Sequence, residues 1–92
     1  MKFPFNEPEN TATLTCCHIV ENGTGILYVS HDAEDGMWQF LCGGTHTQEQ
    51  ARVVSLNEIL TLDNTVSELA NMPSGYIAER KSKHSKWTMK KK

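Results

Sequence analysis

The sequence predicts an α+β domain in which an antiparallel sheet of about five strands carries two short helices on one face. Three observations support this class. Three runs rich in β-forming residues fill the first half of the chain, and the dipeptides Asn22-Gly23 and Asp35-Gly36 separate them. Two short helical patterns follow, and two further β-type runs close the chain around a polar turn. We therefore expect a meander of three strands followed by a C-terminal hairpin.

The first half of the chain predicts an arm and the three strands of the meander. Two prolines make residues 1–13 an irregular arm, from which Phe3 and Phe5 can pack back onto the core. The run LTCCHIV at 14–20 has β-forming residues on both faces, which is typical of a strand covered on both sides, so we place it centrally. ILYVSHD at 26–32 and MWQFLC at 37–42 predict the next two strands.

The middle of the chain predicts a short strand and then a helix. Residues 51–54 can form a short strand or an extended link, and helical structure should begin there or just after. Ser55 can cap this helix, because Glu58 stands three positions later as in a capping box. The apolar residues of the helix then fall on one face, which is formed by Leu56, Ile59 and Leu60.

A second helix and a final hairpin complete the predicted fold. Asp63 or Asn64 can cap the helix, and Pro73 stops it. Its buried stripe would consist of Val66, Leu69 and Ala70. GYIAERK and KWTMKK, at 75–81 and 86–91, predict two strands at the sheet edge, where lysines oppose edge-to-edge association.

The length and composition predict one soluble domain. We divide the 92 residues into an arm at 1–13, an α+β domain at 14–90 and a basic end at 91–92. No apolar run reaches the ~18 residues that a membrane helix needs, and the N-terminus lacks the apolar segment of a signal peptide. The cysteines number three and form no CxxC motif, which favours free thiols in a reducing compartment. We expect a cytoplasmic protein that does not enter the membrane.

Charge is divided sharply along the chain. Residues 1–79 carry eleven acids against Lys2 and Arg52, whereas residues 80–92 carry seven bases and no acid. A surface of one sign attracts partners of the other sign, so the acidic body predicts a basic protein partner. The basic tail is better explained as a solvated terminus than as a nucleic-acid site. The charge pattern leaves the oligomeric state open, a homodimer included.

Six residues with metal-ligand or nucleophilic atoms lie on the predicted strands or at their ends, namely Cys16, Cys17, His18, His31, Cys42 and His46. Adjacent strand residues point to opposite faces, so one ion could not easily collect all of the first three. A site built from His18 or His31 with Cys42 and His46 stays open, as does a thiolate nucleophile at Cys42. The spacings match no zinc motif, and a small buried core residue explains Cys42. The sequence therefore favours neither a metal, nor a cofactor, nor a catalytic residue.

The predicted turn between the second and third strands is acidic. It holds Asp32, Glu34 and Asp35, and Trp38 follows closely. The regular oxygen ligands of an EF-hand calcium loop are absent, so a solvated turn is the simplest interpretation. An exposed aromatic residue beside acids would resemble a protein-binding hot spot, and these four residues are our candidate binding residues.

The order of several segments resembles a small bacterial domain family, first described as being of unknown function and assigned from gene neighbourhood as immunity proteins of polymorphic toxin systems. The resemblance covers about Cys16 to Trp87. Its most specific parts are the D-G-x-W-x-F-x-x-G stretch that begins at Asp35 and the segment from Ser55 to Arg80. It implies a compact α+β domain that binds and neutralises a toxin in the cytosol.

These observations predict a non-catalytic protein-binding module that needs no cofactor and is not an enzyme. With the resemblance, they indicate an immunity protein with a basic toxin domain as its partner. The alternative is a small metal-binding or thiol-dependent protein that uses Cys42, His46 and His31.

Overall fold

A six-stranded mixed sheet organises the protein, as a computed structural model shows for residues 4–5, 7–43 and 48–91. The strands are β1 Ala12–Cys16, β2 Tyr28–His31, β3 Trp38–Leu41, β4 Ala51–Ser55, β5 Tyr76–Glu79 and β6 Thr88–Lys91. The α-helices are α1 Cys17–Asn22 and α2 Leu56–Leu62, and the 3-10 helices are η1 Gln48–Gln50 and η2 Asn64–Leu69. The predicted α+β class is confirmed. No helix within these residues is long and apolar enough to cross a bilayer.

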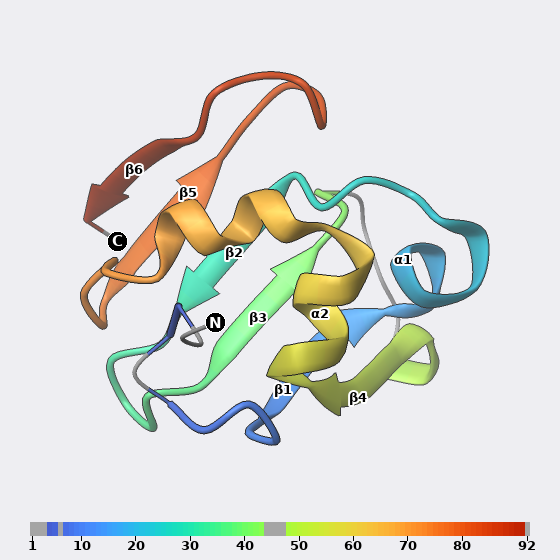
Figure 1. The fold of residues 1–92 in the computed structure, drawn as a ribbon, viewed down its shortest axis with the longest axis horizontal. Helices are drawn as coiled ribbons and strands as arrows, with labels where there is room; N and C mark the ends of the chain where they lie inside the picture. Colours follow the sequence, from blue (N-terminus) through green and yellow to red (C-terminus); the bar gives the residue numbers. More distant parts are fainter. Residues whose placement is uncertain (1–3, 6, 44–47, 92) are drawn as a thin grey trace.

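The sheet order β4-β1-β3-β2-β5-β6 differs in detail from the predicted antiparallel sheet of about five strands, which began with a meander of three (Figure 1). Of the three strands predicted as a meander, only β2 and β3 form a hairpin. Strand β1 instead pairs antiparallel with β4 and parallel with β3, where Thr15 lies beside Phe40. The predicted strand at 14–20 stops at Cys16, and α1 follows it. Its central position is confirmed, since β1 has a neighbour on both sides.

The turn at Asn22-Gly23 differs from the predicted hairpin turn because of the conformation of Gly23. Its φ of 70° places it in the left-handed region, where it ends α1 instead of closing a hairpin. A tight hairpin turn and a helix C-cap both require this backbone conformation, so the Asn-Gly pair does not distinguish them. The Asp35-Gly36 turn is confirmed: Gly36 has a φ of 72° and donates its N–H to the Asp32 carbonyl at 2.9 Å.

Helices α2 and η2 cover one face of the sheet, as predicted (Figure 1). Their inward residues are fully buried, namely Leu56, Ile59, Val66 and Leu69. They share one core with the inward residues of the strands, among which are Val29, Phe40 and Ala78. Phe5 from the arm also joins this core, which confirms the prediction for Phe5, while Phe3 lies outside the described residues. The second helix is of the 3-10 type, and the Asp63 carboxylate caps it by accepting the Thr65 N–H.

The opposite face of the sheet carries a different set of side chains. Strand register pairs Leu14 with Gln39 and Tyr28 with Leu41, and these four residues alternate with the buried row. All four are half-buried, and Val53, which pairs with Leu14, is 67% exposed. We call these five residues the open face.

The final hairpin lies at the sheet edge, as predicted. Strand β6 pairs only with β5 among the described strands, and all four of its residues are exposed. The Lys90 ammonium lies 3.0 Å from the Glu79 carboxylate on β5. Lysines on this edge disfavour the addition of another strand.

The N-cap of α2 gives a first quantitative prediction. The Ser55 hydroxyl accepts the Glu58 N–H at 3.1 Å, as the sequence predicts. Ser55→Ala should lower the free energy of unfolding by about 1 kcal/mol, because the substitution removes the acceptor for this otherwise unpaired donor. Urea denaturation followed by circular dichroism measures the change. Ser74→Ala, at an exposed turn residue, is the control, and an equal loss in both variants would contradict the capping role.

Candidate functional sites

The acidic turn between β2 and β3 is held in place from within. The Asp32 carboxylate accepts hydrogen bonds from the Ser30 hydroxyl at 2.6 Å and from the Gln39 amide at 2.7 Å. The Asp32 N–H donates to the Met37 carbonyl at 2.8 Å, and Asp35 accepts the Met37 N–H at 2.9 Å. These bonds join both ends of the turn, so its tip has a defined shape.

The tip of this turn presents carboxylates to solvent. Glu34 and Asp35 are exposed, and within the described residues no ion pair includes either of them. A shallow hollow of about 490 Å³ lies beside the turn, lined by residues 32–35 together with Gln39, Gly75 and Lys91. Acidic side chains therefore dominate this wall, and Lys91 of the basic tail reaches it from β6.

Trp38 lies beneath the turn and not on the surface. It is 1% exposed, its ring stacks on His31 with centroids 3.9 Å apart, and the Phe5 ring meets it edge-on at 5.1 Å. Its indole N–H donates to the Glu7 carboxylate at 2.8 Å. Of the four predicted binding residues, Asp32, Glu34 and Asp35 thus share one surface, whereas Trp38 supports it from the core.

A cluster of two thiols and one imidazole forms at the other end of the β2–β3 hairpin. The ligand atoms of Cys16, His18 and Cys42 all lie within 4.8 Å of one another, and the Cys42 sulfur is 3.7 Å from His18 Nδ1. Cys16 is fully buried, and the other two residues are half-buried. All three cysteines of the chain are free thiols. This arrangement can bind a thiophilic cation.

The cluster differs from the one that the sequence suggested. His31 pairs with Trp38 at the far end of the hairpin, where its Nδ1 lies 2.9 Å from the Met72 carbonyl and therefore carries the proton that is donated to it. It does not approach Cys42, and His46 lies outside the described residues. His18 was one of the two imidazoles predicted beside Cys42, whereas Cys16 was not expected there, because the predicted first strand ran on through His18 with antiparallel neighbours.

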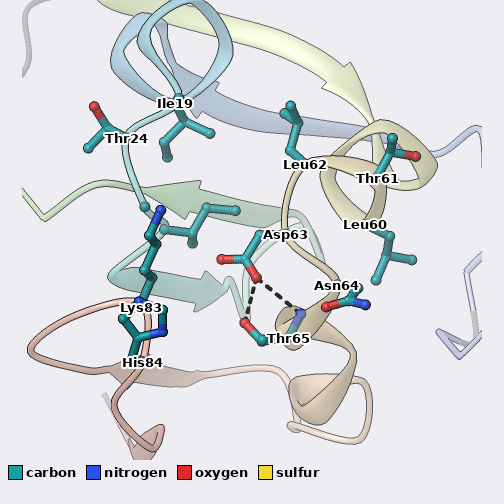
Figure 2. A pocket seen from close by; sticks show the side chains of 13 residues that line it. Ile19, Thr24, Leu60, Thr61, Leu62, Asp63, Asn64, Thr65, Lys83 and His84 are labelled. Atoms are coloured by element: carbon teal, nitrogen blue, oxygen red, sulfur yellow. Dashed lines mark hydrogen bonds between the residues drawn. The ribbon is translucent and has the colours of Figure 1, made fainter.

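A second hollow, of about 570 Å³, lies between the loop after α1, the α2–η2 junction and the loop at 83–84 (Figure 2). Asp63 is its central charged group, and Lys83 and His84 stand across from it (Figure 2). The Asp63 carboxylate accepts the Thr65 N–H and hydroxyl on one oxygen. Its other oxygen lies 2.7 Å from Arg80. These contacts hold η2 against β5, so the polar wall of this hollow serves the fold.

Comparison with known proteins identifies no relative of this chain. No protein family model, no curated protein sequence and no solved structure matches it. The acidic turn and the cysteine–histidine cluster are therefore the features that bear on function.

Proposed function

We propose that this chain is a non-catalytic protein-binding domain that recognises a basic partner through the acidic turn. Following the resemblance of the segment from Asp35 to Gly43, the specific form of the proposal is an immunity protein of the bacterial cytosol that neutralises a toxin. The observation that carries the proposal is the pair of exposed carboxylates, Glu34 and Asp35, on a turn of defined shape. An inhibitor acts by surface complementarity and needs no reactive group.

The electrostatics of the body support a basic partner. Eleven acids lie in residues 1–79, and the ion pairs within the described residues engage few of them. A field of one sign raises the rate of encounter with a partner of the other sign, and salt screens this effect. Association should therefore slow markedly as the salt concentration rises.

The open face supplies the apolar area that carboxylates alone do not provide. Asp32 accepts a hydrogen bond from Gln39, a residue of the open face, so the acidic turn borders this face. A stable complex buries about 800 Å² on each partner and has an apolar centre inside a polar rim. In the proposed complex, Tyr28, Leu41 and Val53 lie at the centre and the turn forms the rim.

Charge reversal in the turn gives a direct test of this proposal. The Glu34→Lys/Asp35→Lys variant should bind the partner at least about 10-fold more weakly, because like charges would face each other in the complex. The partner to use is the product of a neighbouring gene, purified as an inactive variant, and titration calorimetry with the 92-residue chain measures the affinity. A companion assay asks whether co-expression protects cells from the active form of that product.

The matched control reverses the same number of charges on the face of the sheet that the helices cover. Glu58→Lys/Glu68→Lys alters two exposed acids of α2 and η2, and it should leave the affinity unchanged. Equal losses in the two variants would mean that only total charge matters, and the assignment to the turn would then be wrong. An absence of binding to every neighbouring gene product would contradict the immunity role.

A further inference from the structure

We propose that Cys16, His18 and Cys42 form a zinc-binding site. The three ligand atoms come from separate places in the fold: the end of β1, the first turn of α1 and the residue that follows β3. The proposal does not rest on the protein-binding function, because none of the three ligands belongs to the acidic turn, which lies at the opposite end of the β2–β3 hairpin.

The distances fit a tetrahedral site after a small contraction. Zinc–sulfur and zinc–nitrogen bonds of about 2.3 and 2.0 Å imply separations of about 3.5–3.8 Å between ligand atoms. The Cys42 sulfur and His18 Nδ1 are already 3.7 Å apart, and no pair in the cluster exceeds 4.8 Å. The widest pair must therefore close by about 1.3 Å at most, which side-chain rotation can provide.

The sheet topology builds this site. Strands β1 and β3 are parallel neighbours, with Thr15 beside Phe40, so their carboxyl ends reach the same edge of the sheet. Cys16 ends one strand, and Cys42 directly follows the other. Because α1 begins immediately after Cys16, its first turn brings His18 back toward both thiols. Two strands that are fixed by the hydrogen bonds of the sheet thus position the sulfur atoms.

The donor set determines the class of metal. Two thiolates and one imidazole are soft to intermediate ligands, which favour zinc over magnesium or calcium. Two thiolates also neutralise the charge of a divalent cation, so a partly buried site gains no net charge. Within the described residues the cluster supplies three ligands, so a tetrahedral ion would take a fourth ligand from elsewhere, such as a water molecule.

A core role alone explains only part of the cluster. Cys16 is 1% exposed and could serve simply as a small apolar residue. That role gives no reason for an imidazole nitrogen and a second sulfur to converge on it from two other segments. Metal coordination accounts for all three positions at once, and Cys17, which is adjacent in sequence, does not belong to the cluster.

Zinc binding by the 92-residue chain tests the proposal. Protein that has been purified with a non-thiol reductant and stripped of metal should bind one zinc ion, measured by competition with a chromophoric chelator. Cys42→Ser and His18→Gln should each weaken zinc affinity by more than about 100-fold, since losing a metal ligand costs more than losing a residue that hydrogen-bonds to a ligand. Cys17→Ser is the matched control and should retain full affinity.

Cobalt provides a readout that does not depend on any variant. Cobalt added to the wild-type protein should give thiolate-to-metal charge-transfer bands together with the visible bands of a tetrahedral site, and zinc should displace it. The cobalt measurement tests Cys16 without a substitution at this buried position. A cobalt spectrum without charge-transfer bands, no stoichiometric zinc binding, or an equal loss in Cys17→Ser would each overturn the proposal.

Discussion

Replacing Arg80 with alanine should destabilise the domain by about 3–5 kcal/mol, because the substitution removes one partner of a buried ion pair. The Arg80 side chain is 1% exposed, and its guanidinium lies 2.7 Å from the Asp63 carboxylate. It also donates to the Ile26 carbonyl and to the Thr65 hydroxyl, both at 2.9 Å. Domains of this size are stable by only about 5–15 kcal/mol, so the variant should lose a large share of its stability and unfold at a clearly lower temperature.

The shape of the guanidinium matters as much as its charge. Arg80 bonds in three directions and lies over the Trp87 ring, 4.1 Å from its centroid. A lysine keeps the charge but has no planar fork of donors, so Arg80→Lys should fall between wild type and alanine. Thermal and urea unfolding, followed by circular dichroism, would rank the three proteins.

An exposed arginine serves as the matched control. Arg52 pairs with Glu21 at 2.9 Å, but both side chains are more than one-third exposed. Solvent screens such a pair, so Arg52→Ala should cost less than about 1 kcal/mol. If Arg52→Ala and Arg80→Ala unfolded at the same denaturant concentration, the contacts of Arg80 would not stabilise the fold as proposed.

Local patterns were sufficient to predict much of the fold. Ser55 with Glu58, the Asp35-Gly36 turn and the lysine-rich edge each depend on neighbours in sequence, and each lies where it was predicted. The pairing of β1 with β3 depends instead on a contact between distant segments. Because Asn22-Gly23 suits a hairpin and a helix C-cap equally well, nothing local indicated that the chain turns back through α1.

In the candidate sites too, arrangements of sequence neighbours were predictable and contacts between distant segments were not. The acids of the turn are close in sequence and therefore close in space, so the sequence predicted them together. The cysteine–histidine cluster requires β1 and β3 to be parallel, which the predicted antiparallel sheet did not provide, so the sequence left the partners of Cys42 as His18 or His31 together with His46. Arg80 was not identified either, because its contacts with Ile26 and Asp63 span 54 and 17 positions.

Trp38 lies where the core meets the acidic turn, and Trp38→Ala should destabilise the protein by about 3–5 kcal/mol. The substitution empties a fully buried site between Phe5, His31 and Phe40, whose rings all lie against the indole. The arm then loses both its aromatic contact and the hydrogen bond from the indole to Glu7. The variant should therefore lose stability and also release the arm from the sheet.

Graded replacements separate these two contributions. Trp38→Phe keeps an aromatic ring and loses the N–H donor. Because its cavity is smaller, the free energy of unfolding should fall by less than half of the loss in Trp38→Ala. Glu7→Gln keeps an acceptor for the indole and should cost about 1 kcal/mol or less, since the side chain of Glu7 is partly solvated. Circular dichroism suits these measurements because the substitutions remove one of the two tryptophans that fluorescence would report. Proteolysis of the native state would follow the arm separately, and cleavage no faster in Trp38→Ala than in wild type would show that Trp38 does not anchor it.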